Sequence, residues 1–179
     1  MTTLNKPDLL TAMAAHVRGT GLAGASLRPL ARAAGTSDRM LIYHFGSKGA
    51  LIGALLDHLS VEMLSAMSAA LPEPRAETEA ACAAEIVALL RTPTFRPYLR
   101  VWFDIVSAAG RGESDHVAAA ERILQGQVSW IASRLPEGTP RPKQRAREML
   151  ALIQGALVLE VAGLTDPSDR ALARFYPKG

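Results

Sequence analysis

The sequence predicts an all-α protein. Alanine and leucine dominate its composition, β-branched residues are sparse, and aromatic residues make up only 5% of the 179 positions, a balance that favours helices over strands. Apolar residues recur at helical spacing, and short segments rich in Gly and Pro, such as residues 136–142, separate these periodic stretches. No repeat or low-complexity tract interrupts the pattern, so we expect packed helices joined by short turns.

Each helix is placed by its apolar positions and by the residues that end it. The first is expected at residues 7–19, with Leu10, Met13 and Val17 facing inward. A long helix is expected from residue 47 to residue 71, where two prolines end it. It would link the N-terminal part of the chain to the rest. Further helices are expected at residues 76–91, 95–109, 115–135, 142–164 and 168–176.

Residues 26–48 contain two short apolar-periodic segments on either side of Gly35. Ser26 and Ser37 precede these segments, and a serine hydroxyl at that position can accept a hydrogen bond from a free backbone N–H group. Gly35 suits the left-handed residue that ends a helix, and Ser47 is placed to begin the long helix. Two short helices around a tight turn are typical of a helix-turn-helix, whose second helix enters the major groove of DNA.

Polar and aromatic groups are concentrated on the second helix of this motif. Leu41 and Phe45 are one turn apart and are expected to face inward, which leaves the residues between them facing outward. The first residues of a recognition helix reach base edges, and donors near helix N-termini bind phosphate. The candidate base readers are Arg28, Asp38, Arg39 and Met40, the candidate phosphate contacts are Tyr43, His44 and Lys48, and Ser26 and Ser37 complete the DNA-binding set.

These residues resemble the DNA-binding motif of the TetR family of bacterial transcriptional regulators. The family pattern runs from a Thr or Ser before the second helix, through A-x-x-A-G-V-S, to L-Y-x-H-F-x-x-K. The resemblance covers residues 7–60, and the matching positions are Ser26, Ala31, residues 34–37, Leu41, residues 43–45 and Lys48.

Three positions depart from the family pattern. Ile42 stands where the family has a first aromatic residue, Asp38 where members often carry Lys or Gln, and Met40 where Thr or Ala is frequent. Asp accepts a hydrogen bond from cytosine, and Met can pack on a thymine methyl group. The operator is therefore expected to differ from those of the best-known members.

The resemblance implies an N-terminal three-helix DNA-binding head, residues 1–46, joined by a long helix to a helical effector-binding and dimerisation domain, residues 47–179. It implies a homodimeric repressor that binds a palindromic operator in double-stranded DNA and is released by a small-molecule effector, apolar or amphipathic. Effector binding would shift the population of dimers, through the long helix, towards a head spacing unlike that of the operator.

The C-terminal part supplies candidates for the effector site and the dimer interface. The aromatic candidates are equally compatible with an ordinary core. The helix at residues 142–164 is apolar almost all round, so it is expected to be buried on all faces, partly against a second subunit. The effector candidates are Met63, Met67, Tyr98, Trp102, Phe103, His116, Gln127, Trp130 and Gln154, and the dimer candidates are Leu150, Ile153, Leu157, Val161 and Leu164.

The excess positive charge lies in residues 1–60, where six basic and three acidic residues leave a net charge of +3. Residues 61–179 hold fourteen of each sign. A basic excess confined to the predicted DNA-binding third is what phosphate neutralisation requires. A basic run near residue 145 is interpreted as a solvated helix start, or alternatively as a site for an anionic effector or partner: Arg141, Lys143, Arg145 and Arg147.

Other functional classes are disfavoured. The sequence has no G-x-S-x-G, Walker loop or H-E-x-x-H motif, and its four histidines lack the spacing of metal ligands, so we expect no enzyme, cofactor or metal. The single Cys82 suits a reducing cytoplasm, and no signal peptide or uninterrupted apolar run of ~18 residues predicts membrane association. The alternative function is a helical small-molecule-binding or interaction protein whose helix-turn-helix no longer binds DNA specifically.

Overall fold

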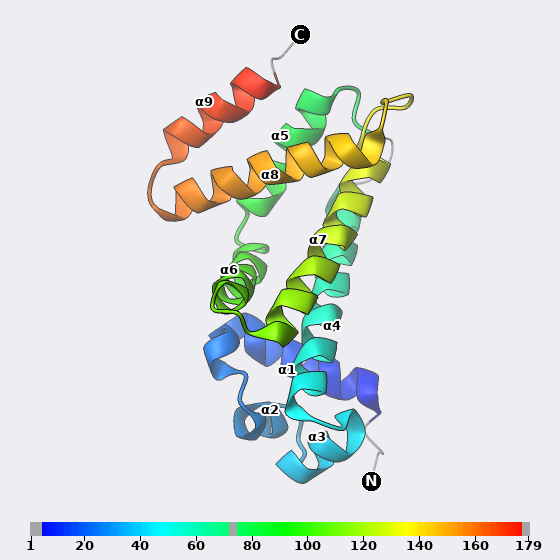
Figure 1. The fold of residues 1–179 in the computed structure, drawn as a ribbon, viewed down its shortest axis with the longest axis vertical. Coiled ribbons are helices and arrows are strands. Elements are labelled where there is room, and N and C mark those ends of the chain that lie inside the picture. The colour runs from blue at the N-terminus through cyan, green and yellow to red at the C-terminus, as the bar shows by residue number, and fades with distance from the viewer. Residues whose placement is uncertain (1–4, 72–74, 177–179) are drawn as a thin grey trace. The chain divides into compact units, whose positions relative to one another are not determined.

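The computed structural model describes residues 5–71 and 75–176. Within these ranges the chain forms helices and no strand (Figure 1), which confirms the all-α prediction. The helices are α1 (Lys6–Thr20), the 3-10 helix η1 (Leu22–Gly24), α2 (Leu27–Ala33), α3 (Asp38–Phe45), α4 (Lys48–Ala70), α5 (Glu79–Leu90), α6 (Arg96–Gly110), α7 (Ser114–Arg134), α8 (Pro142–Val161) and α9 (Thr165–Phe175).

Capping groups explain where the helix ends differ from the predictions. Helix α5 begins three residues later than expected because Thr78 caps it, its hydroxyl accepting a hydrogen bond from the Ala81 N–H group at 3.0 Å. Helix α8 ends at Val161 rather than at residue 164, because the chain turns back and the Leu164 N–H group donates to the Leu159 carbonyl at 2.8 Å. Helix η1 could not be predicted from the sequence, because three residues are too few to show a period.

The chain folds as two compact units, Met1–Ser65 with Pro93–Ile123, and Ala66–Thr92 with Leu124–Gly179. We refer to them as the first and second units. Helices α4 and α7 contribute residues to both. The predicted functional division after residue 46 remains a prediction, because compactness alone does not test it.

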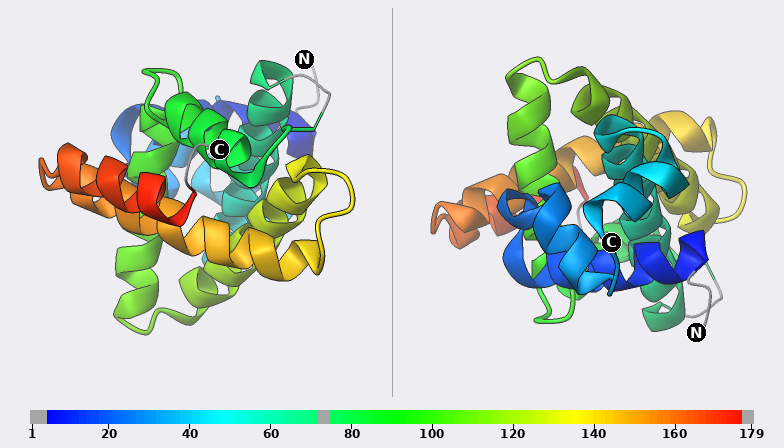
Figure 2. Two further views of the ribbon diagram at one scale, coloured as in Figure 1. Left: turned by 90° about the horizontal axis from the view of Figure 1, so that it is seen from above. Right: turned by 90° about the horizontal axis from the view of Figure 1, so that it is seen from below.

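In the first unit, α1 packs on α2 and on α6, and α2 packs on α3 (Figure 2, right). Met13 and Val17 are completely buried, as predicted. Leu10 was expected to join them, but Leu9 is the buried residue and Leu10 is only half-buried. The shift of one position occurs because the inward face of α1 is set by two neighbours, α2 and α6, and not by one.

Among the described helices, α4 is the one whose length and apolar composition would allow it to cross a membrane. A core helix has the same properties. Many of its apolar side chains are buried, and the Asp57 carboxylate pairs with Arg122 at 2.9 Å. We therefore interpret α4 as a core helix. The buried positions are Leu51, Ile52, Leu55, Leu56, Leu59, Met63 and Met67.

In the second unit, α8 and α9 lie side by side (Figure 2, left). Arg91 at the end of α5 donates hydrogen bonds to Glu160 and Asp169, one on α8 and one on α9. The bond to Glu160 is the largest cause of the raised pKa of the Arg91 guanidinium. Arg145 likewise pairs with Glu79 and Glu148, so this member of the basic run is occupied by internal ion pairs and is not available to an anionic partner.

Candidate nucleic-acid interface

The turn between α2 and α3 has the geometry expected of a helix-turn-helix. Gly35 adopts a left-handed conformation with φ of 63°, the Thr36 N–H group donates to the Ala31 carbonyl at 2.9 Å, and the Gly35 N–H group donates to the Arg32 carbonyl at 3.2 Å. This pair of bonds is a Schellman motif, which satisfies the last carbonyls of a helix. It ends α2 and fixes the direction in which the chain enters α3.

Serine caps begin the next two helices, as the sequence predicts. The Ser37 hydroxyl accepts a hydrogen bond from the Met40 N–H group at 3.3 Å, and the Ser47 hydroxyl accepts one from Ala50 at 3.1 Å. Ser26 occupies the cap position of α2, but its hydroxyl makes no capping bond. That hydroxyl is therefore left exposed and available to another partner.

One buried residue orients the recognition helix. Leu41 has no exposed surface, and it is the buried residue of α3. Phe45, also expected to face inward, is half-buried, and the Lys6 ammonium group lies 5.6 Å from its ring centroid. A cation over an aromatic ring is attracted to it, so Lys6 ties the start of α1 to the end of α3. The sequence analysis missed this contact because the two residues are distant in the chain.

The opposite face of α3 is open to solvent. Asp38, Arg39 and Met40 are exposed at its N-terminal end, where base readers are expected. Tyr43 is 78% exposed, and the His44 ring meets the edge of the Tyr43 ring at 5.5 Å between centroids. His44 is half-buried. The ring contact holds two hydrogen-bonding groups on one side of the helix.

The remaining candidates flank α3. Arg28, near the start of α2, is exposed, and so is Lys48, the first residue of α4. Neither takes part in an ion pair found in the described part of the chain. Unpaired cations beside a helix N-terminus form a suitable site for phosphate.

Helix α6 holds the connection between α1 and α2. The Asp104 carboxylate accepts a hydrogen bond from the Leu22 N–H group at 2.9 Å, and the Arg100 guanidinium donates to the carbonyls of Arg18 and Gly19. Arg18 in turn pairs with Glu62 on α4. Sequence reasoning missed this polar cluster, since nothing in the local pattern of residues 100–104 indicates a partner near residue 20.

The effector candidates fall in several places. In the first unit, burial raises the pKa of the Tyr98 hydroxyl, beside Glu62, and His116 lines a cavity that none of the other candidates lines. In the second unit, the Gln154 amide donates to Gln127 at 3.4 Å, and the Trp130 indole N–H group donates to Ser68 at 2.7 Å. Trp102, Met63 and Met67 are buried, and Phe103 is half-buried.

Two further observations concern metal binding and the single cysteine. In the described residues, no group of three or more His, Cys, Asp or Glu side chains could hold a metal ion. Burial raises the pKa of the Cys82 thiol to about 11, so it is protonated and a weak nucleophile at neutral pH.

Comparisons with known proteins agree with this geometry. Residues 9–55 match the family model of the bacterial regulatory proteins of the tetR family. The HTH-type transcriptional regulator BetI of Paraburkholderia phymatum is 26% identical over 178 residues, covering 97% of this chain and 89% of its own length. The HTH-type transcriptional regulatory protein RaaS of Mycobacterium tuberculosis is 28% identical over 158 residues, covering 86% and 70%.

Two solved structures share the fold. The reduced form of E. coli NemR superposes with a TM-score of 0.71 at 18% identity, covering 94% of each chain. The multidrug binding protein EbrR complexed with imidazole superposes with a TM-score of 0.67 at 21% identity, covering 97% of this chain and 90% of its own. The helix-turn-helix in residues 9–55 thus matches the tetR family of bacterial regulatory proteins, and the chain as a whole is similar to transcriptional regulators in sequence and to a TetR-family structure in fold.

Proposed function

We propose that this regulator is a homodimeric repressor that binds a palindromic operator in the cytoplasm and leaves it when a small-molecule effector binds. The exposed face of α3, held by buried Leu41 and begun by the Ser37 cap, is the observation that carries the DNA-binding part. No catalytic step, metal or cofactor belongs to this proposal.

The division of labour between residues follows from their positions. Asp38, Arg39 and Met40 at the N-terminus of α3 are assigned to base edges, and Met40 exposes 41% of its surface for contact with a thymine methyl group. Tyr43 and Lys48 are assigned to phosphate. The other assigned contacts are Arg28, which is placed for a guanine or a phosphate, and Ser26, Ser37 and His44.

The dimer surface is assigned to the exposed apolar residues of α8 and of the segment that follows it. Val161 is 73% exposed and Leu164 is 48% exposed, and isolated monomers rarely leave such residues clustered in water. Leu150, Ile153 and Leu157 were proposed from the sequence as well, but they are buried within the described chain and have little surface left for a partner. Val158, Leu159 and Phe175 are exposed and replace them.

An effector site is the least constrained part of the proposal. We assign it to the nine candidate residues named from the sequence. EbrR, a protein of the same fold, is a multidrug binding protein. A site of that kind in this chain would take an apolar or amphipathic molecule, because most of its candidates are aromatic or aliphatic.

Selection of bound duplexes from a random oligonucleotide pool tests the proposal. The full chain is incubated with the pool at moderate salt, and a doubly substituted variant, Arg39→Ala with Lys48→Ala, serves as the matched control. We expect enrichment of an inverted repeat whose half-sites lie about one helical turn apart, 34–36 Å, and none with the control.

The opposite outcome favours the alternative function. Failure of the folded, ligand-stripped protein to enrich any sequence would favour a helical interaction protein, since exposed Asp38 repels phosphate at the N-terminus of α3. Salt distinguishes the two further, because any binding to DNA weakens steeply as salt displaces the phosphate contacts, whereas an interaction without phosphate contacts lacks this dependence.

A further inference from the structure

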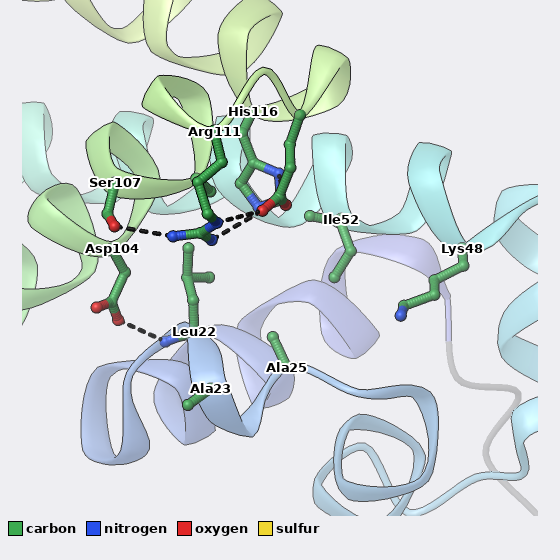
Figure 3. Close-up of a pocket in the computed structure, with 11 residues that line it drawn as sticks. Leu22, Ala23, Ala25, Lys48, Ile52, Asp104, Ser107, Arg111 and His116 are labelled. Atoms are coloured by element: carbon green, nitrogen blue, oxygen red, sulfur yellow. Dashed lines mark hydrogen bonds and ion pairs between the residues drawn. The ribbon is translucent and has the colours of Figure 1, made fainter.

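A cavity of about 360 Å³ lies in the first unit, beside the helix-turn-helix (Figure 3). Four elements line it: η1, the first turns of α4, the end of α6 and the start of α7. Its size is within the range of pockets that bind small molecules. Its apolar lining comes from Leu22, Ala23, Ala25, Ile52 and Ala108, and its polar lining from Lys48, Asp104, Ser107, Arg111, Glu113 and His116.

Three of the ionisable groups satisfy one another. Arg111 donates to Glu113 at 2.7 Å and to the Ser107 hydroxyl at 2.9 Å, and His116 Nδ1 lies 3.2 Å from the same Glu113 carboxylate. Figure 3 shows Ser107, Arg111 and His116 on the same side of the cavity. Glu113 is therefore neutralised by its neighbours, and this side of the cavity offers a ligand little net charge.

Two lining groups of opposite charge form no ion pair with a described residue, and the Arg100 side chain that lies beside Gly21 together with the Asp104 carboxylate donates to backbone carbonyls instead. Asp104 accepts a hydrogen bond only from the Leu22 backbone, and no described basic side chain forms an ion pair with it. Lys48 lacks an ion pair in the same described set. In Figure 3 the two stand at opposite sides of the cavity, with the aliphatic side chains of Leu22, Ala25 and Ile52 between them.

We propose that this cavity binds a small zwitterion whose ammonium and carboxylate groups are separated by an aliphatic chain, an ω-amino acid in the simplest case. The ammonium group would pair with Asp104 and the carboxylate with Lys48, and the methylene groups would lie against the three aliphatic side chains. Hydrogen bonds in which donor and acceptor are charged are stronger than those between neutral groups. A ligand with a single charge would satisfy only one end.

The site has a direct consequence for DNA binding, and this second step rests on the proposed function. Lys48 is assigned both to the ligand carboxylate and to a DNA phosphate, and one ammonium group cannot pair fully with both. The zwitterion is therefore a competitor of DNA that acts at Lys48 itself, within the first unit.

Calorimetric titration of the full chain without DNA tests the site alone. The probes are β-alanine, γ-aminobutyrate, δ-aminovalerate and ε-aminocaproate, with hexylamine and hexanoate as singly charged controls. We expect one chain length to bind best, and each singly charged control to bind at least about tenfold more weakly, as expected from loss of a charged hydrogen bond.

Substitutions locate the binding. Asp104→Asn keeps an acceptor for the Leu22 N–H group but removes the charge, and it should weaken binding of the preferred probe about tenfold or more, as should Lys48→Gln. Lys143→Gln and Asp166→Asn, on exposed residues of α8 and α9, are the matched controls and should leave binding unchanged. Ala25→Met, which narrows the cavity without touching either charge, provides a third variant if Asp104→Asn proves unstable.

Two results would overturn the assignment: no heat of binding from any zwitterion at millimolar concentration, or binding that survives all three cavity variants. The DNA step is measured separately, by adding the preferred probe to a complex with the selected operator. Because the titration contains no DNA and the operator selection contains no zwitterion, failure of this site and failure of the proposed regulator are distinguishable.

Discussion

Gly35→Ala is expected to destabilise the protein by about 1 kcal/mol, without disturbing its packing. Gly35 has a φ of 63°, and a left-handed conformation costs an L-amino acid about 1–2 kcal/mol. A Cβ atom built there meets no other atom within 4 Å, so no steric term is added. Alanine also restricts the unfolded chain, which offsets a few tenths of a kcal/mol.

Two further variants test whether conformation alone sets the cost. Gly35→Asn should cost less than Gly35→Ala, because asparagine adopts the left-handed region more readily. Gly21→Ala should cost more: φ is 77° there, and its Cβ atom would lie 2.9 Å from the Asp104 carboxylate, which already accepts the Leu22 hydrogen bond.

Urea unfolding followed by far-ultraviolet circular dichroism measures these differences, provided that the dependence on urea concentration stays constant among the variants. A decrease in the free energy of unfolding above about 3 kcal/mol for Gly35→Ala would exceed the cost of a left-handed conformation. It would show that the added Cβ atom meets neighbouring atoms. A gain in stability would refute the left-handed turn itself. The folded fraction of Gly35→Ala should bind the selected operator normally.

Other predictions concern DNA contacts and one buried thiol. Tyr43→Phe and Lys48→Ala should each weaken binding to all sequences about equally, and Lys48→Ala should lower the salt slope of log K by about 0.9 per phosphate contact removed; a loss confined to one base pair would contradict the phosphate role. Arg39→Ala or Arg28→Ala should relax preference at one operator position, scored by repeating the selection, whereas uniform weakening would move the residue to the phosphate class. Because the pKa of Cys82 is raised from 9.0 to about 11 in the fold, its contribution to stability is present below pH 9 and is lost as the pH rises through 11, by at most about 3 kcal/mol. The free energy of unfolding, measured by urea titration at several pH values across this window, should fall as the pH rises, and the fall should be smaller for Cys82→Ala. Equal falls in the two proteins would show that folding does not raise the pKa of the thiol.

The helix-turn-helix could be predicted because its signals are local. Ser37 and Ser47 act within three residues of themselves, and Gly35 is required by the conformation of a single turn. Leu41 follows from helical periodicity within one short helix. Each of these signals depends on neighbours in the chain, so a sequence can display it without tertiary information.

The rest of the site depends on residues that are distant in sequence. Lys6 meets Phe45, and Asp104 meets Leu22, only because helices pack. His116 was predicted to lie with the aromatic effector candidates, whereas its Nδ1 atom lies against Glu113 in a cavity that none of the other candidates lines. Charges without counter-ions cannot be recognised from sequence, since every ionisable residue looks unpaired there.

The polar bonds between α6 and the α1–α2 connection constrain how a signal can reach the DNA-binding head. Asp104 and Arg100 make charged hydrogen bonds to the backbone of this connection, and each such bond is worth about 1.5–3 kcal/mol. Pulling α6 away from the connection would therefore cost more than the 1–3 kcal/mol that couples an effector to a second site. A displacement that carries α6 and the end of α1 together breaks none of these bonds. Since Arg18 also ties α1 to Glu62 on α4, α4 and α6 both hold α1, and α1 packs on α2, which in turn packs on α3. If an effector acts as we propose, α6 is therefore a second route to the head besides the long helix.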